Sequence, residues 1–270
     1  MKITAINIYP VKSLGGISLA EALAESRGLA YDRRWMLTDR EGVFLSQREL
    51  PEMARLHPAL DNDHLIIRHA AEAVEPLMVP LNPSSYGAYR KVTVWDSVCD
   101  AVHVSEEADS WFRKVLRAEC QLVYMPDDSM RRPDPMYAKP DDIVSFADGF
   151  PFLIVGESSL EFLNNKLETP VSMNRFRPNF VFSGGLPYEE DRWRHFTIGA
   201  VHFRGVKTCG RCQIITIDQE TLAQGKEPLA TLAKYRNFAN KVKFGMNLCL
   251  ESAPGIIRVG EELLVLEQTV

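Results

Sequence analysis

The chain has 270 residues, of which 46% are hydrophobic and 25% charged, and its formal net charge is −5 at pH 7. This composition is typical of a globular protein with one large or two small domains, and the negative charge argues against general binding to nucleic acids or membrane surfaces. The apolar runs fall short of the roughly 20 residues that a membrane helix needs, and the N-terminus lacks the pattern of a signal peptide. Five cysteines at irregular spacing argue against a disulfide framework, so we expect a reduced, cytoplasmic protein.

The first hundred residues are predicted to form mostly strands. Residues 2–9 make a strand-length run with two largely apolar faces, which indicates a strand buried on each side. Residues 34–38 and 43–46 flank Asp39-Arg40-Glu41-Gly42, and this pattern predicts a hairpin with Gly42 at positive φ. Further strands are expected at residues 64–69 and 90–95.

Three helices are expected after residue 100. Ser105 can cap the first, because apolar residues follow it at the spacing of one helical face: Ala108, Trp111, Phe112, Val115 and Leu116. The second spans residues 157–167, and the third begins near Pro228 and ends at about residue 236. We expect a long loop at 126–140 and strands at 151–155, 179–182, 196–206, 213–218 and 262–266. This pattern predicts a mainly β (α+β) fold with β-barrel-like parts.

The stretch Thr208-Cys209-Gly210-Arg211-Cys212 lies between two strand-like runs, so its thiols are held by rigid flanks and can still be reached. The cations Lys207 and Arg211 favour the thiolate, which is the form that binds metals. A zinc site would need four ligands, and the other cysteines are scattered singly. A thioredoxin-like dithiol would need a helix after the motif, where we expect a strand. Two inert buried thiols are the remaining alternative.

Cations gather at the predicted ends of strands. Tyr9-Pro10-Val11-Lys12-Ser13 ends the first strand and precedes two glycines, which suits an anion-binding nest, although the residue order is not that of a P-loop. Asp32-Arg33-Arg34 and Asn174-Arg175-Phe176-Arg177 place arginines at the starts of other strands. Each cation could be an ordinary surface charge. Together, in an acidic protein, they predict a pocket for a phosphorylated small molecule.

Five motifs in this order resemble the MOSC superfamily: YPVKS, DRRW, NRFRPNFVFSGG, CGRC and KEPLATLAKYR. The resemblance spans nearly the whole chain and is to the β-barrel members that include the mitochondrial amidoxime-reducing component and its bacterial relatives. It implies an N-terminal β-barrel domain at residues 1–120 packed on a MOSC β-barrel domain at 121–270. It also implies a molybdenum cofactor (molybdopterin), with Cys212 as the metal ligand and catalytic residue.

The resemblance further implies which residues contact the cofactor: Lys12, Ser13, Arg33, Gly149, Phe150, Arg177, Asn179, Gly210, Arg211 and Asn247. Two departures from the family pattern affect this set. The Asp-Thr-Ser-Pro turn of the amidoxime reducers is Asp148-Gly149-Phe150-Pro151 here, so two hydroxyls are lost and backbone N–H groups are expected to serve. Asn247 stands where relatives carry a tyrosine that lines the site.

The implied function is reduction of N-hydroxylated small molecules at the molybdenum, with electrons from a separate ferredoxin or flavin-reductase type of partner. The alternative is a sulfur-transfer or cofactor-carrier protein that uses Cys212 as persulfide or ligand. The sequence contains no C-x4-C-x2-C run and no G-x-G-x-x-G fingerprint, and it has no room for a pyridoxal-phosphate domain. We therefore expect no PLP, FeS, flavin or NAD site in this chain.

Overall fold

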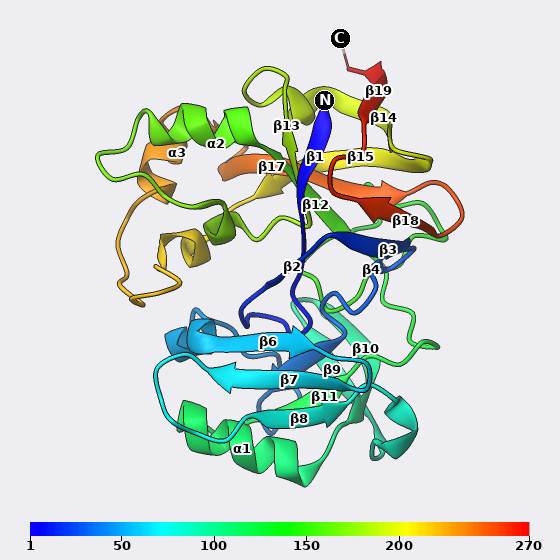
Figure 1. Ribbon diagram of the computed structural model, residues 1–270, viewed down its shortest axis with the longest axis vertical. Coiled ribbons are helices and arrows are strands. Elements are labelled where there is room, and N and C mark those ends of the chain that lie inside the picture. The colour runs from blue at the N-terminus through cyan, green and yellow to red at the C-terminus, as the bar shows by residue number, and fades with distance from the viewer. Residues whose placement is uncertain (270) are drawn as a thin grey trace.

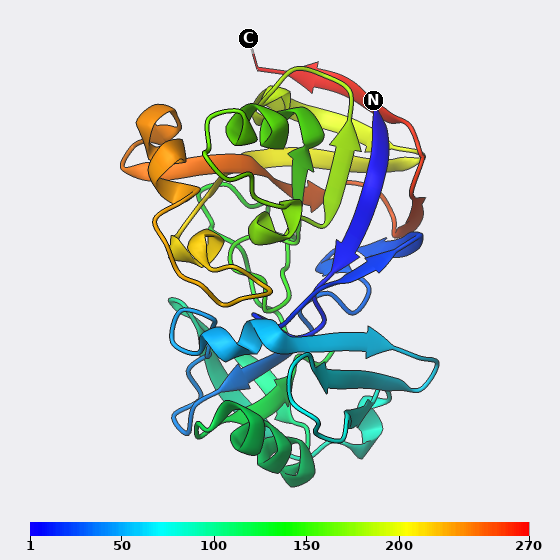
Figure 2. The same cartoon turned by 60° about the vertical axis from the view of Figure 1, so that its left-hand side comes forward.

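The structure, a computed structural model, describes residues 1–269 and divides into two bodies that lie one above the other in Figure 1. The upper body contains the N-terminus and most of the second half of the chain, and the lower body contains β5 to β11 and α1. Figure 2, turned by 60°, shows the same division. Strands dominate the described residues, with three α-helices among them, which confirms the mainly β fold predicted from the sequence.

The largest sheet lies in the upper body and runs in the order β19-β14-β15-β17-β12-β13-β1-β2, with β16 paired to β17. Neighbouring strands are antiparallel except β12 and β13, which run parallel. The bounds are β1 Lys2–Ile8, β2 Ile17–Leu19, β12 Phe152–Gly156, β13 Phe180–Ser183, β14 Trp193–Ile198, β15 Val201–Gly210, β16 Asn237–Phe238, β17 Lys241–Leu250 and β19 Leu263–Gln268. The beginning of the chain is thus built into a sheet made mainly from its second half.

A small sheet in the order β18-β3-β4 packs against the large one, with bounds β3 Glu21–Glu25, β4 Gly28–Leu29 and β18 Gly255–Arg258. Residues of both sheets share one core, which includes Ala24, Ile257, Phe152, Phe180 and Phe203. This enclosure of a core by curved sheets is what a β-barrel-like domain requires.

Two sheets and one helix build the lower body. Their strands are β5 Trp35–Thr38, β9 Tyr89–Val94, β10 Ser97–His103 and β11 Gln121–Tyr124 in one sheet, and β6 Leu56–Leu60, β7 His64–His69 and β8 Leu77–Pro80 in the other. The helix α1 (Glu106–Leu116) buries Phe112 in the core that both sheets share. Ser105 caps α1 as predicted, since its side chain accepts the N–H of Ala108 at 3.1 Å. The boundary expected at residues 120 and 121 stays a prediction; β11, which follows it, pairs with β5.

Short helices cover one side of the large sheet. These are α2 (Glu157–Asn164), α3 (Leu229–Tyr235) and the 3-10 turns η3 (Met173–Phe176) and η5 (Gln213–Thr216). The turn η4 (Glu189–Arg192) also packs on this sheet, against β12, β15 and β17, whereas η1 (Pro51–Arg55) and η2 (Pro83–Ser85) lie in the lower body. The second predicted helix ends three residues early, and residues 126–140 form the expected loop. In the described part of the chain, every helix is too short or too polar to cross a bilayer.

Two predicted strands are wrong. Residues 196–206 do not form one strand, because Gly199 takes a positive φ of 55° and turns the chain between β14 and β15. Residues 213–218 do not form a strand after the cysteine motif, because Ile215 is buried in the core beneath α3 and the chain coils there as η5. The expected strand after the motif, which argued against a thioredoxin-like dithiol, is therefore absent. However, η5 is a 3-10 turn of four residues and not the α-helix that such a motif needs.

Two other predictions hold only in part. Gly42 has the expected positive φ of 84°, but the second arm of its hairpin makes isolated bridges at Val43 and Phe44 in place of a strand. In β1, a bulge between Ile3 and Ala5 brings Ile3, Ile6 and Ile8 into one core and leaves Thr4 exposed. The strand is therefore buried mainly on one face.

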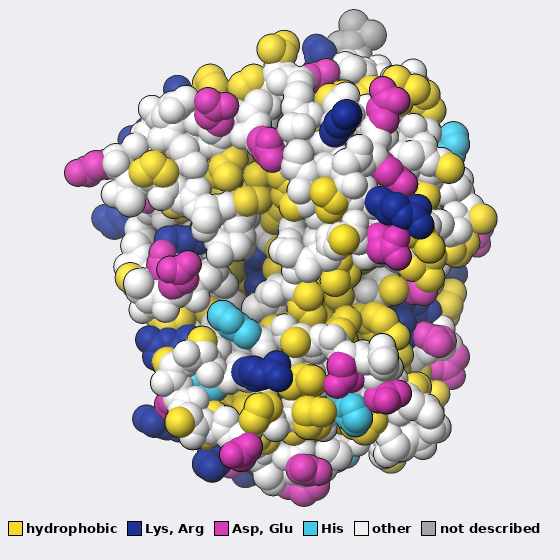
Figure 3. Space-filling view, viewed as in Figure 1, with side chains coloured by type: hydrophobic (Ala, Val, Ile, Leu, Met, Phe, Trp, Pro, Cys, Tyr) yellow, Lys and Arg dark blue, Asp and Glu magenta, His cyan; other side chains and the backbone are white. Residues whose placement is uncertain are grey.

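Charged side chains are interspersed on the face of the molecule seen in Figure 3, where acidic and basic groups alternate. A single basic face is not visible in this view.

Candidate functional site

The chain leaves the large sheet after β1 and passes between the two bodies, where it places Lys12 and Ser13. The backbone N–H of Lys12 donates to the carbonyl of Trp35 at 2.8 Å, and Ser13 has a positive φ of 68°. The buried ammonium of Lys12 donates to the carbonyl of Phe146 at 2.8 Å and forms an ion pair with Asp148. Burial lowers the pKa of Lys12 to about 8, and the carboxylate of Asp148 limits this shift.

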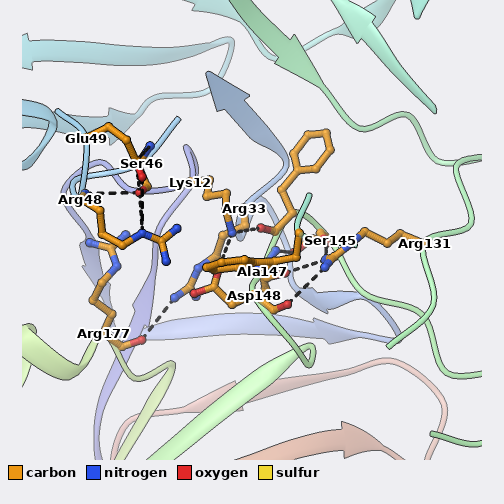
Figure 4. A network of polar contacts seen from close by, with 12 residues as sticks. Lys12, Arg33, Ser46, Arg48, Glu49, Arg131, Ser145, Ala147, Asp148 and Arg177 are labelled. Atoms are coloured by element: carbon orange, nitrogen blue, oxygen red, sulfur yellow. Dashed lines mark hydrogen bonds and ion pairs between the residues drawn. The ribbon is translucent and has the colours of Figure 1, made fainter. Parts of the chain in front are cut away.

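The loop that carries Asp148 is held by a buried arginine. Arg131 donates to the carbonyls of Ser145 at 2.7 Å, Ala147 at 2.6 Å and Asp148 at 3.2 Å (Figure 4). The Asp148 side chain opens onto the cavity and is 64% exposed. Desolvation in the cavity acts to raise the pKa of this carboxyl, but the charge and hydrogen bond of Lys12 and the hydrogen bond from Trp95 hold it well below its usual range.

Arg33 and Arg177 lie side by side although 144 residues separate them. Both have left-handed backbones, with φ of 50° and 54°, and Arg33 donates to the carbonyl of Arg177 at 3.3 Å (Figure 4). Asp32 accepts from Nη1 of Arg33 at 2.9 and 2.7 Å, so Arg33 has a partner for its charge. Desolvation lowers the pKa of Arg177 to about 10.

The cysteine motif forms the end of β15 and the turn after it. Gly210 pairs with Lys243 of β17, and Arg211 donates from Nε to the carbonyl of Phe244 at 2.9 Å and from Nη1 to that of Phe176 at 2.8 Å. Cys212 follows in an extended conformation at the start of η5, and its side chain is exposed. Cys209 is half-buried. Of the two thiols, Cys212 is therefore the more accessible.

The residues proposed from the sequence all line one cavity of about 320 Å³: Lys12, Ser13, Arg33, Gly149, Phe150, Arg177, Asn179, Gly210, Arg211, Cys212 and Asn247. This volume lies within the range of small-molecule sites, roughly 300–1,000 Å³. Their convergence from both halves of the chain is a structural finding. Their roles as ligands stay a prediction.

Two of these residues, Asn179 and Asn247, use their side chains within the protein, and two glycines, which were expected to contribute backbone only, leave space. The amide of Asn179 accepts the N–H of Leu153 at 3.2 Å and donates to the carbonyl of Asn7 at 3.1 Å, so it ties strands together. Asn247 donates to the carbonyl of Lys207 at 3.1 Å. A Cβ on Gly149 would meet no atom within 4 Å, and one on Gly210 only the Lys241 side chain at 3.9 Å. These glycines leave open space along the cavity wall.

The cavity also contains residues that the sequence motifs did not single out: Phe44, Ser46, Gln47, Arg48, Lys241 and Lys243. Asp148, Arg175 and Lys207 belong to those motifs without having been assigned to the cofactor, and they line the cavity as well. Lys241 and Lys243 alternate along β17 and so share a face beside Gly210. The spacing of these two lysines in the sequence predicts that they share one face of a strand. It does not predict that this face borders the cavity, because that depends on the pairing of β17 with β15.

Cations dominate the lining and exceed what nearby acids neutralise. Asp148 is the one acidic residue among the described lining residues, against nine cationic ones: Lys12, Arg33, Arg48, Arg175, Arg177, Lys207, Arg211, Lys241 and Lys243. Within residues 1–269, Arg177, Arg211, Lys241 and Lys243 form no ion pair. One buried Nη2 donor on Arg177 and one on Arg211 have no hydrogen-bond partner. Unpartnered buried donors are costly, so this arrangement fits a ligand that carries several negative charges.

Comparison with known proteins gives two domain families that divide the chain. The model of the MOSC N-terminal beta barrel domain matches residues 1–119, and that of the MOSC domain matches residues 141–264. Mitochondrial amidoxime-reducing component 1 is 33% identical to this chain in both Mus musculus and Homo sapiens, and each match covers 97% of this chain and 81% or 82% of the relative. The molybdenum cofactor sulfurase of Solanum lycopersicum is 31% identical; the match covers 97% of this chain but 35% of that protein.

Proposed function

Because this chain belongs to the family of MOSC-domain proteins, we propose that it is a molybdenum-cofactor enzyme that reduces N-hydroxylated compounds. The observation that carries the proposal is the cavity, in which a solvent-accessible thiol and an excess of unpaired cations lie together. The amidoxime-reducing components, with which the chain aligns over nearly its whole length, support the choice of substrate class.

The residues present fit this cofactor. The thiolate of Cys212 is a soft ligand of the kind that suits a soft metal centre. The free donors of Arg177 and Arg211 and the charge of Lys12 would hold the phosphate of the cofactor through charge-assisted hydrogen bonds. When bound, the cofactor supplies a redox-active metal, and the protein supplies its ligation, orientation and electrostatic surroundings.

The carboxylate of Asp148 would act on the substrate and not on the anionic cofactor. Arg131 fixes the loop that carries Asp148, and so keeps an ionised carboxylate in the cavity as a hydrogen-bond acceptor. That carboxylate is suited to holding a cationic or proton-bearing part of a substrate, since it would repel an anion. We expect electrons to come from a separate protein, and the reduced cytoplasmic compartment stays a prediction.

The test is to purify the chain from a host that makes the cofactor and to measure its molybdenum content and its activity. We expect close to one molybdenum per chain and reduction of an amidoxime by a reduced viologen dye. With NADH or NADPH alone, the chain should be inactive until a ferredoxin or flavin-type partner is added.

A cofactor or sulfur carrier is the rival function, supported by the match to the cofactor sulfurase. Absence of molybdenum together with a labile sulfur on Cys212 would favour that function. Bound molybdenum without activity toward any N-hydroxylated compound would also argue against a reductase.

A further inference from the structure

Tyr9 makes contacts with two cationic residues of the cavity. The guanidinium carbons of Arg33 and Arg177 each lie 4.2 Å from the centroid of its ring. The side chain of Arg33 also donates to the backbone carbonyl of Arg177. One aromatic ring therefore makes cation–π contacts with two positively charged guanidinium groups.

The ring is held firmly in this place. Tyr9 is buried, its hydroxyl donates to the carbonyl of Pro178 at 3.3 Å, and its backbone N–H donates to Asp32 at 2.7 Å. A Cβ on Gly16 would come within 2.6 Å of the ring, so the absence of a side chain there leaves room for it. Arg33 in turn donates its backbone N–H to the carbonyl of Tyr9 at 2.9 Å.

The two arginines differ in how their charge is balanced. Asp32 accepts both hydrogen bonds from Nη1 of Arg33. Within residues 1–269, the Arg177 guanidinium has neither a carboxylate partner nor a hydrogen-bond acceptor, and its Nη2 is buried. A desolvated cation without compensation is strongly unfavourable.

An aromatic face compensates such a cation in a way that a carboxylate cannot. The N–H donors of a guanidinium lie in its plane, whereas the ring attracts the charge through its π face. A carboxylate would occupy the donors and cancel the charge. The ring stabilises the charge and leaves the donors free for a ligand.

We propose that Tyr9 is a positioning residue that holds Arg33 beside Arg177 and keeps Arg177 charged with open donors, for the phosphate group of an anionic ligand. The inference rests on the proposed function in that the ligand is the phosphate-bearing cofactor. The role of Tyr9 itself needs only an anion, so it can be tested without the cofactor.

The test uses the full chain, purified from a host that does not make the cofactor, with inorganic pyrophosphate as the probe in calorimetry at pH 7. Y9F keeps the ring and should bind within twofold of the unchanged chain. Y9L removes the ring and should bind about tenfold more weakly, because both arginines lose their cation–π contact. Binding by Y9L within twofold of the unchanged chain would overturn the proposal.

A matched control removes a ring with the same kind of contact elsewhere. Arg236 lies 4.3 Å from the ring centroid of Tyr188, which does not line the cavity. Y188L should therefore leave pyrophosphate affinity unchanged. An equal loss in Y188L and Y9L would show a general structural effect and reject the positioning role.

A second measurement covers the case in which Y9L does not fold. The unchanged chain is labelled with 3-fluorotyrosine, and the fluorine resonance of residue 9 is assigned by its loss in Y9F. This resonance should shift when pyrophosphate is added, and a resonance that stays fixed at saturation rejects the proposal. Molybdenum content of the loaded chain is measured separately, so failure of the proposed function is distinguishable from failure of this inference.

Discussion

Gln47 and Gln219 donate to each other through their side-chain amides, at 3.2 and 3.0 Å. Gln47 belongs to the lower body and lines the cavity, whereas Gln219 follows η5 in the upper body. The second N–H of the Gln47 amide donates to the carbonyl of Ser13 at 2.7 Å. This buried amide therefore has its donors and its acceptor satisfied, and it joins the two bodies beside the cysteine turn.

We predict that Q47A and Q219A each destabilise the chain by about 1–3 kcal/mol, because each leaves polar groups of its partner without a hydrogen bond. The double variant should cost less than the sum of the single ones. Denaturant unfolding of the four chains measures this coupling. Strictly additive losses would mean that the pair does not contribute as a unit.

Glu190 is a buried carboxyl in the upper body, away from the cavity, and is fully enclosed. It accepts from the N–H of Gly156 at 3.2 Å and from the hydroxyl of Ser159 at 2.9 and 3.0 Å. Burial raises its pKa to about 7, against the hydrogen bonds that favour the charged form. Folding therefore raises the proton affinity of this group.

The sign of the resulting pH dependence follows from proton binding. Between about pH 4.5 and 7 the folded chain keeps a proton that the unfolded chain has released, so the contribution of Glu190 to stability falls as the pH rises through this window. We predict that E190Q matches the unchanged chain at pH 5 and is more stable at pH 8, by up to about 3 kcal/mol. Thermal unfolding of both chains between pH 5 and pH 8 measures this difference in stability. As a control, E161Q on the exposed side of α2 should leave the dependence of stability on pH unchanged. If the stability of E190Q changed with pH in the same way as that of the unchanged chain, the prediction would be contradicted.

The sequence predicted the cavity-lining cations better than it predicted the strands around them. Lys12, Arg33 and Arg177 could be found because each follows or precedes a run of apolar residues, a local feature. Lys243 could not, because its position depends on pairing of β17 with β15, which sets it opposite Gly210. Long-range register of this kind is decided by tertiary packing.

Local patterns also misled where packing overrode propensity. Ile214 and Ile215 favour a strand by their branched side chains, yet Ile215 is buried in the core beneath α3 and the chain coils there. Asn179 has a motif position that suggested a ligand, whereas its amide is engaged with the backbone of Asn7 and Leu153. Hydrogen bonds between distant segments carry no signal in a single sequence.

Cys212 and Cys209 are expected to differ in their effect on bound metal. Cys212 is exposed at the turn and Cys209 is half-buried. We predict that C212A, purified from a host that makes the cofactor, loses nearly all its molybdenum, whereas C209A retains most of it. Metal analysis of both variants, with circular dichroism as a folding control, measures this. Equal retention in the two variants would remove Cys212 as the ligand.

The charge of Lys12 should make anion binding dependent on pH. Its pKa of about 8 means that the ammonium is mostly charged at pH 7 and mostly neutral at pH 9. Once it is neutral, the carboxylate of Asp148 faces the cavity without compensation and repels an anion. Affinity should therefore fall as the pH rises through about 8.

Sulfate is a suitable probe, because its own charge does not change between pH 7 and pH 9. The protonated fraction of Lys12 falls about tenfold over this interval, so binding that requires the ammonium should weaken about tenfold. K12M should bind sulfate weakly and with little change across the interval, since the arginines of the cavity stay charged. The measurement is calorimetric titration of the cofactor-free chain at several pH values. A flat profile in the unchanged chain, or the same decline in K12M, would show that another group is responsible.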